Sequence, residues 1–297
     1  MLALFFCGAY LWGRTSSIAC IMTSQTTQIL RISRQSSTWL DDEVVVEGPL
    51  ALRYRYTDSE AHPLSVTMRT PGADRALGLG LLFAENIINT IQDVHATEAH
   101  SEIAEQGIST DVVTFTLASH VAPPTSSSAR TFISSSSCGL CGKTSFDASF
   151  PAEKSTLLTD VPTISHNVLF GMSEQVRAAQ PTFARTGGIH AAALFDWGGN
   201  LLAACEDIGR HNALDKLLGL GLEAGWWPNP NAVLFLSSRL SYELMQKAIR
   251  AGLTCVVGIS APSSLAVRMA REHGVTLVGF MRDKRCNIYT HPHRIRI

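Results

Sequence analysis

The chain has 297 residues, of which 45% are hydrophobic and 16% charged, and its net charge is −1. This composition supports a sizeable core in one large domain or two smaller ones, and the small net charge excludes a protein-wide basic field for nucleic acid. No run of roughly eighteen uncharged apolar residues occurs, so no stable membrane span is expected.

The first residues, MLALFFCGAYLWGRTSSIACIM, are apolar but lack a preceding basic residue, which makes them a poor secretory signal. Three interpretations stay open: a membrane-directed peptide, an organelle presequence, or an upstream extension of a protein that starts at Met22. The sequence favours the third, because the residues from Met22 onward are typical of a cytosolic start. We therefore expect a cytoplasmic protein in which residues 1–41 are an extension that is disordered or arises from a misassigned start.

The next part of the chain is predicted to be β-rich. EVVVEGPLALRYRY (43–56) and HPLSVTMRTPG (62–72) predict strands, and the second ends in a Pro-Gly turn. Apolar residues at helical spacing predict a helix from about Asp74 to Ile91, and DVVTFTLAS (111–119) predicts a further strand. The polar segment EAHSEIAEQG (98–107) predicts a surface loop.

The composition then shifts. HVAPPTSSSARTFISSSSCGLCGKTS (120–145) is rich in Pro, Ser and Gly and predicts a loop. We accordingly divide the rest of the chain into an N-terminal part (42–130), a mobile loop with a CxxC pair (131–150) and a C-terminal α/β part (151–297).

The C-terminal part alternates strand and helix. AAALFD and NLLAAC, within residues 191–205, are joined by Trp197-Gly198-Gly199 and predict a hairpin. Strands are then expected at 232–238, 254–260 and 275–280, separated by helices at 241–252 and 263–274. This βαβαβ order predicts a parallel sheet with right-handed crossovers, and such sheets bind ligands at the carboxyl ends of their strands.

Among seven cysteines, only Cys138 and Cys141 have a spacing that carries chemistry. The odd, scattered count argues against the disulfide framework of a secreted protein. Cys205 and Cys255 belong to apolar runs, so we expect both to be buried. Cys286 fits either an extra reactive thiol or a partly buried strand residue.

The CxxC pair fits several chemistries. A structural zinc site needs about four ligands, and one CxxC supplies two. A zinc deaminase combines an upstream H-x-E with P-C-x-x-C; His100-Ser101-Glu102 supplies the first half, but Ser137 stands in place of the proline. A thioredoxin-like disulfide and two incidental cysteines are further alternatives. Sulfur transfer needs an exposed, nucleophilic thiolate, which the loop and nearby Lys143 favour.

Polar residues also follow the predicted strands. Arg210 and His211 lie near the start of a helix that follows a strand, where a phosphate can meet helix amides; a polar helix cap is the structural alternative. Arg239 and Arg282 lie at other strand ends, and arginine binds phosphates bidentately. His190 follows two glycines and fits a cleft or a core position equally well.

Six segments occur in an order that is typical of a known family: TMRTPG (67–72), SSCGLCGKTS (136–145), TGGIHAAAL (186–194), EDIGRHNALDK (206–216), SAPSSLAV (260–267) and YTHPHRI (289–295). Together they resemble the FdhD family, the sulfur carrier or accessory proteins of formate dehydrogenase. The resemblance covers about residues 44–295, and EDIGRHNALDK is too long and unusual for a chance match.

This resemblance implies a fold and a function. The expected fold is a cytidine-deaminase-like α/β core that tends to three layers, with a mixed sheet, flanking helices and a smaller N-terminal β-rich portion, but without the deaminase zinc. Family members take sulfur from a cysteine desulfurase as a persulfide on the CxxC. They deliver it to the molybdenum of the bis-molybdopterin guanine dinucleotide cofactor that formate dehydrogenase uses. By this resemblance, Cys138 carries the persulfide and Cys141 is secondary.

The resemblance also implies cofactor contacts and partners. The cofactor-binding stretch is FMRDKR, which comprises Phe280, Met281, Arg282, Asp283, Lys284 and Arg285. Arg210 and His211 are expected to contribute to the same binding. The expected partners are a cysteine desulfurase, formate dehydrogenase and a second copy in a homodimer, with neither nucleic acid nor a resident metal. A non-catalytic chaperone of the molybdenum cofactor remains the alternative to a sulfurtransferase.

Overall fold

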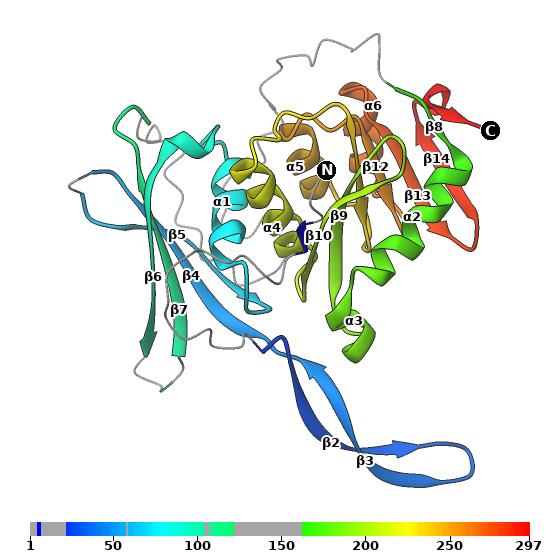
Figure 1. The fold of residues 1–297 in the computed structure, drawn as a ribbon, viewed down its shortest axis with the longest axis horizontal. Helices are drawn as coiled ribbons and strands as arrows, with labels where there is room; N and C mark the ends of the chain where they lie inside the picture. Colours follow the sequence, from blue (N-terminus) through cyan, green and yellow to red (C-terminus); the bar gives the residue numbers. More distant parts are fainter. Residues whose placement is uncertain (1–4, 7–21, 58, 104–106, 108, 122–161) are drawn as a thin grey trace.

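Two sheets of unequal size form the molecule, with helices between them (Figure 1). The computed structural model describes residues 5–6, 22–57, 59–103, 107, 109–121 and 162–297. The larger sheet has seven strands in the order β1-β10-β9-β11-β12-β13-β14, and the smaller has four in the order β5-β4-β7-β6. A separate two-stranded sheet, formed by β2 (Ser24–Ile32) and β3 (Ser37–Val45), projects from the body. Its strands begin inside the range 1–41, for which the sequence predicts an extension.

The smaller sheet is the expected N-terminal β-rich portion. It consists of β4 (Gly48–Arg55), β5 (His62–Arg69), β6 (Val94–Ile103) and β7 (Ser109–Leu117). The central strands β4 and β7 are parallel, and each outer strand is antiparallel to its neighbour. The prediction of a surface loop at 98–107 is wrong for most of that segment, which belongs to β6. An edge strand keeps many side chains in solvent, so its sequence is as polar as that of a loop.

Helix α1 (Asp74–Ala84) packs against α4 (Arg210–Glu223) between the two sheets (Figure 1). A Cβ atom at Gly80 of α1 would collide with the backbone of α4 at Asp215, so the two helices approach closely because glycine occupies this position. The predicted helix to Ile91 ends early, at Ala84. Asn86 has a φ of 59°, a left-handed conformation that terminates helices.

The larger sheet contains the five strands predicted in the C-terminal part, together with β1 and β14. It contains β9 (His190–Asp196), β10 (Leu201–Asp207), β11 (Ala232–Leu236), β12 (Cys255–Gly258), β13 (Thr276–Arg282) and β14 (Arg285–Thr290), with the short β1 (Phe5–Phe6) beside β10. The β9–β10 hairpin is confirmed. So is the βαβαβ unit, in which α5 (Tyr242–Arg250) and α6 (Ser264–Glu272) connect three parallel strands.

Helices cover both faces of the larger sheet. One face shares a core with α1, α4, α5, α6 and the smaller sheet. The other face packs on α2 (His166–Ala178), and the short strands β8 (Ile164–Ser165) and β15 (Ile295–Arg296) lie on this side; α3 (Pro181–Thr186) leads into β9. This mixed sheet with flanking helices confirms the predicted α/β class.

The structure also shows how far three cysteines are buried and whether any helix could span a membrane. Cys205 and Cys255 are fully buried, as predicted, and Cys286 is half-buried on β14. Within the described ranges, every helix is too short or too polar to cross a membrane.

Candidate functional site at the carboxyl edge of the larger sheet

The carboxyl ends of β10, β11, β12 and β13 meet at one edge of the larger sheet. Since β9 is antiparallel to β10, its first residue, His190, lies opposite the last residue of β10, Asp207. Helix α3 and the base of the β2–β3 hairpin lie at the same end of the molecule (Figure 1). The described residues of the predicted site are distributed along this edge.

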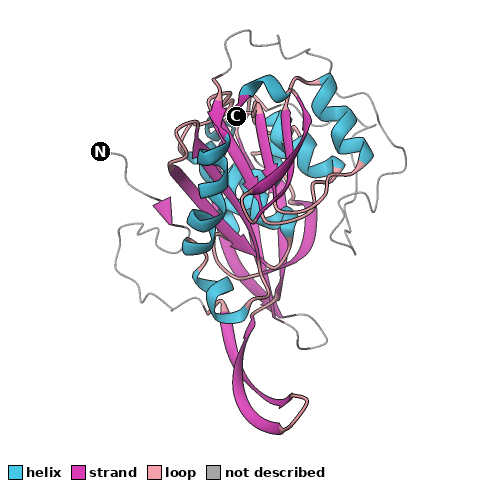
Figure 2. Cartoon of the chain, turned by 90° about the vertical axis from the view of Figure 1, so that its right-hand side faces the viewer, coloured by secondary structure: helices cyan, strands magenta, loops and turns pink. Residues whose placement is uncertain are grey.

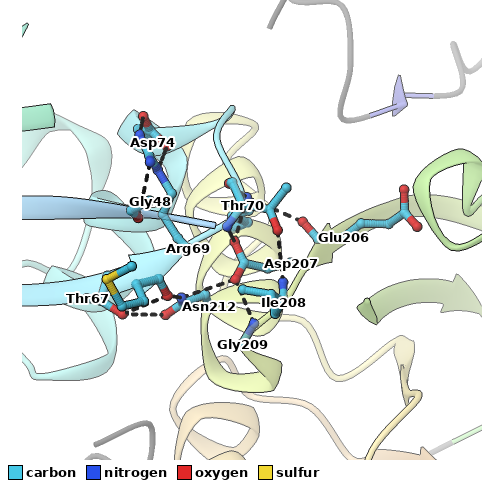
Figure 3. A network of polar contacts seen from close by, with 12 residues as sticks. Gly48, Thr67, Arg69, Thr70, Asp74, Glu206, Asp207, Ile208, Gly209 and Asn212 are labelled. Carbon is cyan, nitrogen blue, oxygen red and sulfur yellow. Dashed lines mark hydrogen bonds and ion pairs between the residues drawn. The ribbon is translucent and has the colours of Figure 1, made fainter. Parts of the chain in front are cut away.

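A buried polar network fixes the turn from β10 into α4 (Figure 3). The carboxylate of Asp207 is fully buried and forms an ion pair of 2.7 Å with Nζ of Lys216. It also accepts hydrogen bonds from the backbone N–H of Thr70 (3.2 Å), the backbone N–H of Gly209 (2.8 Å) and the side-chain amide of Asn212 (3.1 Å). These four donors satisfy a charge that would otherwise be costly to bury.

The same network joins two distant sequence motifs. Lys216 donates to the carbonyl oxygens of Thr70 (2.8 Å) and Glu206 (3.3 Å), and the hydroxyl of Thr70 accepts the backbone N–H of Ile208 at 3.1 Å. TMRTPG, at the end of β5, is thereby bonded to EDIGRHNALDK, at the β10–α4 junction. The unusual length of the second motif has a structural reason, because several of its members hold the two sheets together.

Arg210 and His190 lie together beyond this junction. Arg210 is the first residue of α4, and its buried Nε has no hydrogen-bond partner among the described residues. Burial and then the positive charge of Arg210 lower the pKa of His190 from its usual value, while the Asp207 carboxylate opposes them. The ring is therefore neutral at pH 7. His211, also half-buried, follows Arg210 on the first turn of α4.

The ring of His190 is held by Ser237, the residue after β11. Nδ1 of His190 lies 3.3 Å from the Ser237 hydroxyl, which also accepts the backbone N–H of Ala191 at 2.8 Å. These two contacts join the start of β9 to the end of β11. An incompletely bonded guanidinium near this neutral ring suits an anionic oxygen such as that of a phosphate.

The segment FMRDKR forms the β13–β14 hairpin at the far end of the same edge. Arg282 pairs with Arg285 across a turn in which Asp283 and Lys284 both have a φ of 53°. This geometry exposes Arg282, Lys284 and Arg285 to solvent.

The first two residues of that segment have different environments. Phe280 is half-buried, with a φ of 54°, and its backbone N–H donates to the carbonyl oxygen of Ser260 at 3.2 Å. Met281 is 1% exposed and packs in the core on the α2 side. Of the six residues expected to bind cofactor, Met281 therefore presents only its backbone to a ligand.

The structure does not bring Arg210 and the hairpin together. Four strand spacings separate β10 from β13 in the sheet order, which corresponds to roughly 19 Å at about 4.8 Å per spacing. An anion that contacts both places must be elongated. The sequence indicated Arg210 and the β13–β14 hairpin separately. It did not predict the contact of His190 with Ser237, because that contact depends on the pairing of β9 with β11; the only indication near His190 was Gly187-Gly188.

The two cysteines of the CxxC pair, Cys138 and Cys141, lie outside the described residues. The H-x-E segment, which matches the first half of a zinc-deaminase motif, lies on β6 of the smaller sheet. There Arg53 binds both carboxylate oxygens of Glu102 at 2.8 Å, and this contact, with His100, lowers the pKa of Glu102 to about 2. Within the part of the chain that the structure describes, no three His, Cys, Asp or Glu side chains are grouped to hold a metal ion.

The chain is similar in sequence to proteins of a known family. The model of the FdhD/NarQ family matches residues 45–296. The sulfur carrier protein FdhD of Mycobacterium tuberculosis is 43% identical over 258 residues, which cover 86% of this chain and 92% of that protein. The protein of the same name from Sulfurisphaera tokodaii is 38% identical over 274 residues, covering 92% and 100%.

A solved structure supports the fold. The crystal structure of a protein from Desulfotalea psychrophila, described as a formate dehydrogenase accessory protein, has a TM-score of 0.65 to this chain at 21% identity. The matched region covers 93% of this chain and 100% of the Desulfotalea chain. The similarity therefore extends over both sheets.

Proposed function

Because this chain belongs to the FdhD/NarQ family, we propose that it is a sulfur carrier that serves a formate dehydrogenase. The observation that carries the proposal is the family match over residues 45–296, which includes the CxxC pair. A cysteine desulfurase is the proposed sulfur donor, and the molybdenum of a bis-molybdopterin guanine dinucleotide cofactor is the proposed acceptor. We further propose that the carrier acts as a homodimer.

Cys138 is the proposed acceptor of sulfur. Its thiolate attacks the outer sulfur of the persulfide on the desulfurase, so that a new S–S bond forms on Cys138 and the donor cysteine leaves as a thiolate. Attack by the Cys141 thiolate on the inner sulfur of Cys138 then releases the outer sulfur as sulfide for the metal. The two electrons come from the cysteines, which become a disulfide that a dithiol reductant must reopen.

The carboxyl edge of the larger sheet is the proposed binding place of the cofactor. Two kinds of cationic group support this assignment: the half-buried Arg210 beside neutral His190, and the exposed Arg282, Lys284 and Arg285 of the β13–β14 hairpin. In this role the cofactor is cargo that the protein passes on, not a resident group. Its length, with a nucleotide at each end, suits two anion-binding places separated by roughly 19 Å.

The proposal is tested by sulfur loading. The full chain is incubated with a cysteine desulfurase and cysteine, and persulfides are mapped by mass spectrometry. We expect about one added sulfur atom on Cys138 in the parent and in Cys141→Ser, and none at this position in Cys138→Ser. Cys286→Ser is the matched control and should load normally, because burial raises the pKa of its thiol.

A second readout separates the carrier from the chaperone. Cys138→Ser should fail to activate formate dehydrogenase while it still binds guanosine diphosphate, a surrogate for one end of the cofactor. A Cys138→Ser protein that activates the enzyme fully would instead support a non-catalytic chaperone.

A further inference from the structure

Arg239 lies on the carboxyl edge of the larger sheet, in the loop that follows β11. In the sheet order, β11 is two strands from β10 and two strands from β13. At about 4.8 Å per spacing, the end of β11 is roughly 10 Å from the end of β10 and roughly 10 Å from the β13–β14 hairpin. Helices cover both faces of this sheet (Figure 2), so an elongated ligand meets the strands at an edge. A ligand that contacts both ends of the carboxyl edge therefore passes Arg239 at its middle.

The backbone on either side of Arg239 is fixed. Ser237 exchanges two hydrogen bonds with Ala191 of β9: its backbone N–H donates to the Ala191 carbonyl oxygen at 3.0 Å, and its hydroxyl accepts the Ala191 N–H at 2.8 Å. Leu240 is fully buried, and its backbone N–H donates to the carbonyl oxygen of Ala261, in the loop after β12, at 3.1 Å. Because both neighbours are held, the backbone of Arg239 is positioned before a ligand arrives, which lowers the entropy cost of binding.

The guanidinium of Arg239 is open to a ligand. It is exposed, and it has no ion pair, hydrogen bond or ring contact with any residue that the structure describes. Exposed arginines elsewhere differ from it: Arg185, for example, lies 3.6 Å from the carboxylate of Glu43. A guanidinium without a partner keeps all of its N–H donors, and its fork can bind two oxygens of an anion at once.

We infer that Arg239 binds the negatively charged middle of an elongated ligand whose two ends lie at Arg210 and at the β13–β14 hairpin. The inference rests on the proposed function, because that ligand is the proposed cargo, with a nucleotide at each end and molybdenum between them. The sulfur ligands of the metal carry negative charge, which a fixed guanidinium stabilises. Arg239 thus holds the sulfur acceptor at one point of the edge, while the two outer places hold the nucleotides.

The test compares a one-ended with a two-ended probe by titration calorimetry of the full chain. Guanosine diphosphate represents one end, and diguanosine tetraphosphate has a guanosine at each end of a phosphate chain. The parent should bind the two-ended probe at least about tenfold more tightly. Arg239→Ala should weaken binding of the two-ended probe at least about tenfold, as expected for one charge-assisted hydrogen bond. It should change the affinity for guanosine diphosphate by less than about twofold.

Two further variants serve as controls. Arg239→Lys keeps the charge but not the planar fork, so it should recover part of the affinity for the two-ended probe. Arg271→Ala removes an exposed arginine from the last turn of α6, which precedes β13 and therefore lies at the opposite edge of the sheet. It should leave both affinities unchanged.

Three results would overturn the inference. The first is equal affinity of the parent for the two probes. The second is an Arg239→Ala variant that binds the two-ended probe as tightly as the parent. The third is an equal loss for both probes, which would make Arg239 a contact of one end. Persulfide loading of Cys138 in the same variants separates such a failure from failure of the proposed function, because loading needs no nucleotide.

Discussion

The side chain of His190 is held between groups with opposite effects on its protonation. Burial and Arg210 lower its pKa, and Asp207 raises it. The ring orientation is fixed by Ser237, whereas Arg210 lies on a different element, the start of α4. The position of α4 therefore contributes to the lowered pKa of a residue on β9, and the buried Asp207–Lys216 pair ties α4 to the end of β10.

Removal of the guanidinium in Arg210→Gln should raise the pKa of His190. The value should remain below about 6.5, since burial is the larger cause and is unchanged. The pKa is measured by NMR titration of the imidazole C–H resonances. Arg239→Gln is the control, because Arg239 is exposed at the end of β11 and is not among the groups that shift His190. An unchanged pKa in Arg210→Gln would remove Arg210 from the environment of His190.

At the scale of elements, the β13–β14 hairpin presents cations on a turn with a defined backbone. Arg282→Ala with Arg285→Ala should weaken binding of guanosine diphosphate by about 1.5–3 kcal/mol for each charge-assisted hydrogen bond lost. The affinity of the parent should also fall as salt rises, because exposed charges are screened over about 10 Å at 0.1 M. Both effects are measured by titration calorimetry.

The matched control for the hairpin is Arg268→Ala, which removes an exposed arginine from α6. It should leave the nucleotide affinity unchanged. A double hairpin variant that binds guanosine diphosphate as tightly as the parent would exclude the hairpin from the binding place. Persulfide loading of Cys138 should be unaffected in either variant.

The elements differ in how well the sequence predicted them. The βαβαβ unit was predictable because its strands are buried on both faces and its helices end at Gly252 and Gly274, both with positive φ. The end of α1 was not predictable, because apolar residues continue at helical spacing beyond Asn86, although the left-handed conformation of Asn86 ends the helix. The strand ends alone indicated Arg239 and Arg282, whereas the role of the rest of FMRDKR was implied only by the family resemblance. The burial of Met281 was not predictable, because the positive φ of Phe280 and the register shift between Gly279 and Arg282 break the alternation of side chains along β13.

At the scale of the whole molecule, stability depends on a buried ion pair between α4 and α5. Asp215 and Lys247 form a close ion pair with side chains that are 3% and 11% exposed, and burial raises the pKa of Asp215 from 3.8 to about 6 despite the nearby cation. Because the folded pKa is the higher one, this group stabilises the fold below about pH 4, and that contribution is lost as the pH rises through about 6.

Lys247→Met should make this pH dependence steeper. Without the cation, the pKa of Asp215 rises further, so the variant should lose about 3–5 kcal/mol at pH 8, where the carboxylate is ionised and unpaired. The loss should be smaller at pH 5, where the carboxyl group is protonated. Urea unfolding at the two pH values measures both losses. Lys284→Met removes an exposed lysine and should change neither, and equal losses at both pH values in Lys247→Met would contradict this account.

The close contact of α1 with α4 has a consequence for synthesis on the ribosome. The two helices are separated by 125 residues of chain (85–209), which take roughly 6–25 s to translate at about 5–20 residues per second. During this interval β6 and β7 complete the smaller sheet beside α1, but the face of α1 that carries Gly80 has no α4 to cover it. The nascent chain thus exposes an apolar helix face for seconds. During this period the chain is most open to aggregation and to binding by a chaperone.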